Sequence, residues 1–176
     1  MAVSRLLLLT LITHATCTSV REVSGNITGT ENTWSGVILL MDKVRVLEGA
    51  QLTVLPGTEV RARRTAATTQ SAECVWIAEE ARKIVADDAA GLIIEQGGQI
   101  FARGTADSPI VFTVDADEGK RHGMWGGIVI AGRAPVQGQG PHFAEGLGGQ
   151  YGGNYPGDNS GELRHVRIEY AGGVWR

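Results

Sequence analysis

Short runs in which apolar and polar residues alternate recur along the chain and predict a protein built from β-strands. Val44-Arg45-Val46 and Leu52-Thr53-Val54 are two of these runs. A period of two sends successive side chains to opposite faces of a strand, one buried and one in solvent. By the same pattern we expect Val60 and Ala62 to face inward and Arg61 to face outward.

Turn signals divide the chain into more such strands. Pro56-Gly57 is a strong turn signal, and Asp42-Lys43 is expected to turn the chain after a buried strand at 37–40. The polar stretch at 23–34 is expected to form the N-terminal entry, or cap, of the stack of strands, since its first strands need a covered end. Further strands are predicted at 92–94, 100–102, 110–113, 125–130 and 163–170.

One phrase of the sequence occurs twice, at 47–58 and again at 94–105. Each copy holds an apolar strand, a glycine turn, a second alternating strand and Gly-Thr. Gly97 follows Gly49 by 48 residues, about two turns if one turn of a β-solenoid takes about 20–25 residues. The repeat therefore predicts an all-β solenoid, a parallel β-helix, rather than a closed sandwich.

Two segments interrupt this pattern. Apolar residues between 65 and 90 recur at helical spacing, and Glu79 and Lys83 form a favourable i,i+4 pair, so a short α-helix near 76–88 is expected on an inserted loop. That helix would cover a face or an edge of the solenoid, or alternatively dock a partner. Residues 135–160 form a long glycine-rich loop.

The first 19 residues read as a secretory signal peptide. Arg5 is followed by an apolar run at 6–12 and small residues at 15–17, and the run is shorter than the roughly 20 residues that span a bilayer. Removal of this segment places the protein outside the cell or on its surface. An alternative makes Cys17 an acylated lipoprotein cysteine. Without Cys17, Cys74 has no intrachain partner and is either buried or paired with another chain.

The length, charge and composition of the chain limit its domain number and its general binding partners. The chain has 176 residues, which suits one domain at 20–176, and its net charge of −3 gives no general attraction to nucleic acid or anionic membranes. Twenty-five glycines indicate many tight turns. Asn26-Ile27-Thr28 is an N-glycosylation sequence, which has meaning only in a eukaryotic secretory pathway.

Five phrases of the sequence, taken in order, carry a resemblance to a known family; they stand at 49–58, 104–113, 125–132, 151–153 and 158–172. With these phrases the chain resembles secreted bacterial-type right-handed parallel β-helix proteins of pectate-lyase-like fold, mostly uncharacterised. The resemblance implies a right-handed β-helix and an extracellular or surface setting, and it implies no catalytic motif for this chain. The sequence looks like the N-terminal part of a longer member of the family.

Few residues suggest chemistry. Tyr151 and Tyr155, in the glycine-rich loop, are candidates for stacking on sugar rings. Asp115 and Asp117, with Asp158 from a later loop, offer oxygen ligands for Ca²⁺; otherwise no cofactor is expected. The alternative is that these acidic side chains are solvated or hydrogen-bond nearby backbone. No catalytic residue is assigned.

Two functional hypotheses follow. The first is a secreted or cell-surface β-helix scaffold with a structural, adhesive or glycan-binding role and no catalysis. Its partners would be an extracellular polysaccharide or a surface component, with end-to-end association through an uncapped C-terminal coil as a further expectation. The alternative is a polysaccharide lyase or hydrolase, or its remnant, which needs two carboxylates on one exterior surface, such as Asp115 and Glu169.

Overall fold

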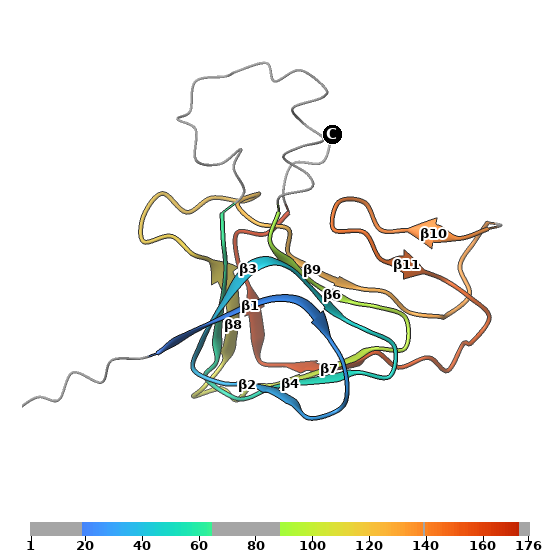
Figure 1. The fold of residues 1–176 in the computed structure, drawn as a ribbon, viewed down its shortest axis with the longest axis horizontal. Coiled ribbons are helices and arrows are strands. Elements are labelled where there is room, and N and C mark those ends of the chain that lie inside the picture. The colour runs from blue at the N-terminus through green and yellow to red at the C-terminus, as the bar shows by residue number, and fades with distance from the viewer. Residues whose placement is uncertain (1–18, 65–88, 139, 173–176) are drawn as a thin grey trace, which may run out of the picture.

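A computed structural model describes residues 19–64, 89–138 and 140–172, and all of its regular structure is β-strand (Figure 1). The all-β parallel β-helix predicted from the sequence is confirmed. The expected signal peptide, the expected α-helix near 76–88 and Cys74 lie outside the described residues. The strands are β1 Val20–Ile27, β2 Asn32–Trp34, β3 Val37–Val46, β4 Gln51–Val54, β5 Glu59–Ala62, β6 Gly91–Ile94, β7 Gln99–Arg103, β8 Ile110–Val114, β9 Ile128–Ile130, β10 His142–Phe143, β11 Gln150–Tyr151, β12 Gly161–Arg164 and β13 Val166–Ile168.

The strands wind around a three-sided interior (Figure 1). Side 1 holds the first halves of β1 and β3 with β5, β8 and β13. Side 2 holds the second halves of β1 and β3 with β6 and β9. Side 3 holds β2, β4, β7 and β12. Apart from the small antiparallel pair β10–β11, every pairing is parallel.

The interior is a ladder of apolar residues stacked one coil above the next. On side 1, Ile38 pairs with Val60 and Val60 with Phe112, and each of these side chains is at most 1% exposed. On side 3, Leu52 stacks on Ile100 in the same way. The alternation read from the sequence is thus the alternation between this ladder and the outer surface.

The two copies of the repeated phrase lie directly against each other. Gln51 pairs with Gln99, and the Gly49 amide donates to the Gly97 carbonyl at 2.9 Å. The copies therefore occupy adjacent coils, and the interval between them is not two regular turns, as the insertion expected between the copies implies. One coil holds the whole interval because β5 ends at Ala62 and β6 begins at Gly91, and the partners of these two residues in β3 are only three positions apart.

Several predicted boundaries also differ. Residues 23–34, expected to form the N-terminal entry or cap, lie in the first coil, in which β1 pairs with β3 and β2 with β4. The expected turn at Asp42-Lys43 is the corner between sides 1 and 2, but it lies inside the single strand β3 and does not end it. The last predicted strand, 163–170, is two strands, because His165 has a positive φ of 47° at the corner between β12 and β13. The strand predicted at 125–130 is limited to β9.

The last described coil leaves inward-facing positions uncovered. Ile130 stacks on Ile94 and Ile168 stacks on Phe112, yet Ile130 is 43% and Ile168 48% exposed, because no described strand lies above them.

Within the described ranges, no helix is long and apolar enough to cross a membrane.

Candidate functional site

The glycine-rich segment between β9 and β12 folds back along the outside of side 2 (Figure 1). Its centre is the β10–β11 hairpin, in which His142 pairs with Tyr151 and Phe143 with Gln150. The Ala144 amide donates to the Gly149 carbonyl at 3.0 Å and closes the turn. The segment expected to be a loop therefore contains a small antiparallel sheet.

Leu147, in the hairpin turn, fastens the hairpin to the coil. Its side chain is only 2% exposed and packs in a second apolar cluster with Ile93 and Ala89, with Val129 at its margin. The Arg45 guanidinium donates to the Leu147 carbonyl at 3.0 Å.

Two glycines form the socket for Leu147. A Cβ on Gly91 would lie 2.5 Å from Leu147 Cδ1, and one on Gly126 would overlap Leu147 Cδ2. Any larger residue at either position would fill the space that the leucine occupies. The Leu147 side chain thus fixes the position of the hairpin, because it fills the space beside Gly91 and Gly126, which have no side chains.

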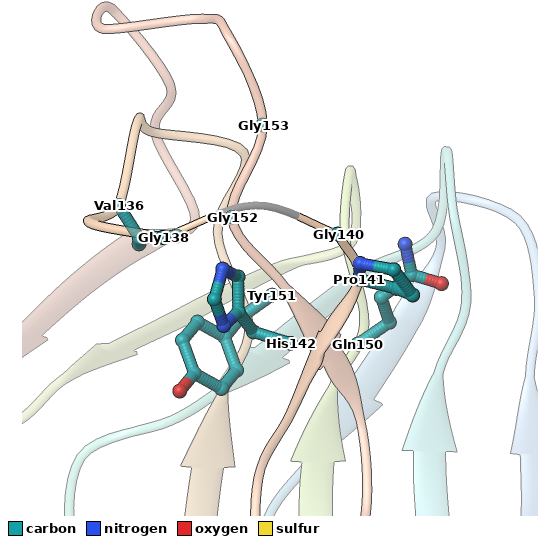
Figure 2. A pocket seen from close by; sticks show the side chains of 9 residues that line it. All are labelled: Val136, Gly138, Gly140, Pro141, His142, Gln150, Tyr151, Gly152 and Gly153. Carbon is teal, nitrogen blue, oxygen red and sulfur yellow. The ribbon is translucent and has the colours of Figure 1, made fainter.

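A pocket of about 420 Å³ lies at the open end of this hairpin (Figure 2). The rings of His142 and Tyr151 lie side by side in it, with centroids 5.6 Å apart and planes inclined by 30°. Much of the remaining wall is glycine backbone, so peptide N–H and C=O groups lie close to the space. The lining residues are Val136, Gly138, Gly140, Pro141, His142, Gln150, Tyr151, Gly152 and Gly153.

Hydrogen bonds from the coil hold the far wall of the pocket. The Gln96 side-chain amide donates to the carbonyls of Gly152 at 2.6 Å and Gly132 at 3.2 Å, and the Gly152 amide donates to Gly132 at 2.8 Å. A Cβ on Gly153 would lie 2.7 Å from the Arg133 carbonyl oxygen, so this approach requires glycine. The wall is therefore tied to the turn before β7.

His142 is the polar side chain of the pocket whose hydrogen bonding is incomplete. Its Nε2 atom is buried and has no hydrogen-bond partner in the described structure. A buried ring nitrogen without a partner costs free energy, on the order of 1–3 kcal/mol.

The structure separates the two tyrosines predicted to bind sugar. Tyr151 lines the pocket and is 37% exposed. Tyr155 is 58% exposed and is not among the residues that line the pocket. It lies in a turn, where its backbone amide donates to the Arg133 carbonyl and its own carbonyl accepts from the Asp158 amide. Their role in binding glycan stays a prediction.

The three aspartates proposed for Ca²⁺ have different neighbours. Asp115 lies 3.9 Å from an Arg61 nitrogen at the end of β8, and Asp117 follows in the same loop. Asp158 instead accepts a hydrogen bond from the Arg133 amide at 2.9 Å. Across the described residues, no group of three or more His, Cys, Asp and Glu side chains is arranged to hold a metal ion. The Ca²⁺ site has no further support and stays a prediction.

Charged side chains on the outside of side 1 are matched with one another. Arg61 donates to both carboxylate oxygens of Glu59, and Arg167 pairs with Glu169. The hydrogen bond that Arg61 donates to Glu59 raises the pKa of Arg61 above its ordinary value. Burial opposes this shift, and the negative charges of Glu59, Asp115 and Asp117 add to it. Three carboxylates of this surface, Glu59, Asp115 and Glu169, thus have an arginine beside them.

Asn26, the possible glycosylation site, is exposed in β1 opposite Arg45. That position is compatible with modification and does not test it.

Comparison with known proteins agrees with this architecture. A family model of the pectate-lyase-like β-helix domain matches residues 25–176. The chain belongs to this family. No curated protein and no solved structure matches the chain significantly. Membership of the pectate-lyase-like β-helix family fixes the scaffold, and a scaffold of this kind hosts unrelated activities, so the site has to be argued from its residues.

Sequence reasoning missed the hairpin, the socket and the role of His142, although signals for the first two exist. Leu92-Ile93-Ile94 is an unbroken apolar run, the pattern of a strand buried on both faces. Leu147 is the one apolar side chain in Gly146-Leu147-Gly148-Gly149, a glycine-rich turn between two short polar and aromatic pairs. Together they indicate a hairpin docked by its leucine.

Proposed function

We propose that this pectate-lyase-like β-helix protein acts outside the cell as a glycan-binding scaffold, with the His142–Tyr151 pocket as its binding site. The observation that carries the proposal is the pairing of an exposed tyrosine ring with a buried, unsatisfied histidine nitrogen in one pocket. A sugar ring offers what both need, because its C–H face packs on an aromatic ring while its hydroxyls hydrogen-bond.

Exposed aromatic side chains near the pocket support this role. Phe143 is 63% exposed, and with Tyr151 it gives the β10–β11 hairpin two solvent-accessible aromatic rings. Aromatic rings that remain accessible favour recognition of amphipathic ligands. The carboxylates of side 1 offer no comparable support for hydrolysis, since arginines engage them.

A binding assay with immobilised polysaccharides tests the proposal. The chain should be retained on at least one extracellular polysaccharide, and Tyr151→Ala should weaken retention about tenfold, the effect of removing roughly 1.4 kcal/mol of contact. Tyr155→Ala is the matched control, because Tyr155 is exposed on the same segment but does not line the pocket. Absence of retention, or equal effects of the two variants, would contradict the proposal.

A further inference from the structure

We infer that the pocket selects neutral sugars and rejects uronates, the acidic sugars of polyanionic polysaccharides. This inference rests on the proposed glycan-binding function and narrows it to one ligand class. Its basis is the absence of any Asp, Glu, Lys or Arg among the nine described residues that line the pocket.

Two arginines of the coil beside the hairpin segment are engaged in ion pairs. The Arg133 guanidinium pairs with Glu48, and its backbone lies against Gly153 of the pocket wall. Arg45 is paired with Glu95 and donates to the Leu147 carbonyl. Neither arginine is among the described residues that line the pocket.

A carboxylate in this pocket would lose water without gaining a cation. Burying an ion without an opposite charge costs far more free energy than burying a hydroxyl that finds a hydrogen-bond partner. The overall charge of −3 adds weak repulsion of polyanions at low salt.

A neutral hydroxyl, in contrast, suits His142 in either tautomer. A hydroxyl both donates and accepts, so it can satisfy Nε2 whether or not that nitrogen carries a proton, whereas a carboxylate can only accept. Peptide N–H and C=O groups of the glycine-rich wall provide further partners for hydroxyls, which both donate and accept. The volume of about 420 Å³ is near the lower end for small-molecule sites, which suits a short segment of a glycan.

The test compares neutral oligosaccharides with oligogalacturonates of equal length in calorimetric titrations of the full chain. We expect binding to a neutral oligosaccharide that changes little between low and high salt, and that falls about tenfold in His142→Ala, as loss of one hydrogen bond in a pocket predicts. Addition of a chelator should leave this binding unchanged.

A gain-of-function variant gives a second, independent measurement. Val136 lines the pocket and is 40% exposed, so Val136→Arg places a cation at the rim and should create salt-sensitive oligogalacturonate binding. Val20→Arg, at a residue 52% exposed on β1, is the matched control and should not.

The outcomes are distinguishable. Oligogalacturonate binding by the unmodified chain that Tyr151→Ala removes would overturn this inference and leave the proposed function standing. Failure of both ligand classes to bind would overturn both. Equal oligogalacturonate binding by Val136→Arg and Val20→Arg would show that the lining charge of the pocket does not decide selectivity, and would also overturn the inference.

Discussion

Replacing Leu147 with alanine tests whether one side chain holds the hairpin against the coil. The side chain is 2% exposed and fills the socket beside Gly91 and Gly126. Leucine-to-alanine changes at buried sites cost about 2–5 kcal/mol, the cost rising with the cavity that remains. Because the hairpin is attached at the surface of the coil and can settle into the gap, we expect the lower part of that range, about 2–3 kcal/mol.

Urea unfolding followed by circular dichroism measures the loss, and hydrogen exchange locates it. The Ala144 amide, which closes the hairpin turn, should exchange faster in Leu147→Ala, whereas amides in the coil interior should change less. Leu55→Ala is the matched control, since Leu55 is 41% exposed and the same atoms are removed; its cost should stay within about 0.5 kcal/mol. Equal losses in the two variants would refute the reasoning.

A double-mutant cycle isolates the fit between leucine and glycine. Gly126→Ala alone should destabilise by about 1–3 kcal/mol, because its new Cβ would overlap Leu147. In the Leu147→Ala background most of that conflict disappears, although the new Cβ still lies 3.1 Å from the Ala90 carbonyl oxygen. The two losses should therefore fail to add by on the order of 1 kcal/mol, and strict additivity would show that the socket does not exist.

Three further predictions concern the coil itself. Thr113→Val should leave the free energy of unfolding in urea unchanged or raise it by up to about 1 kcal/mol, because it removes a buried hydroxyl that has no hydrogen-bond partner. A decrease of about 1 kcal/mol would instead indicate that the hydroxyl has a partner. Trp125→Phe should lower the free energy of unfolding by about 1–3 kcal/mol, because the smaller ring fills less of the buried site and cannot donate the 2.7 Å hydrogen bond to the Glu169 carbonyl. An unchanged unfolding midpoint in urea would contradict this. The hydrogen bond from Arg103 lowers the pKa of Glu162. The ionised Glu162 carboxylate therefore contributes its full share to stability above the ordinary glutamate pKa, and this contribution is lost as the pH falls through the lowered pKa of the folded protein. Unfolding midpoints of the unmodified chain and Glu162→Gln should accordingly differ near neutral pH and converge in acid; a constant difference would exclude this origin.

The sequence predicted which residues face inward but not how far apart the coils lie along the chain. Ile38, Val60 and Phe112 stack in one ladder, yet 22 residues separate the first two and 52 separate the last two. Alternation is a property of a strand and is visible locally. The register between strands depends on what each corner contains, and the corner after β5 contains a long segment that no local pattern measures.

The candidate site shows the same limit. Tyr151 was a candidate because an aromatic residue in a glycine-rich segment tends to be accessible, and it does line the pocket. The candidate role of His142 rests on its buried Nε2 atom, which has no hydrogen-bond partner in the described structure. Whether a side-chain nitrogen has a partner depends on the folded structure and cannot be read from the sequence. Ile93 lies on the outward face of its strand and is nevertheless 0% exposed, because a turn more than 50 residues later covers it.

The corner between β5 and β6 separates chain length from geometry. Leu40 in β3 pairs with Ala62, and Lys43, three residues on, pairs with Gly91. Three residues of strand span about 10 Å, so the chain leaves the coil and rejoins it at two points that β3 holds close together. A segment of any length that bridges this short gap satisfies the same register. This corner is therefore a natural place for exchange of segments between family members, and an engineered loop or small domain could be grafted there without moving the pocket on side 2.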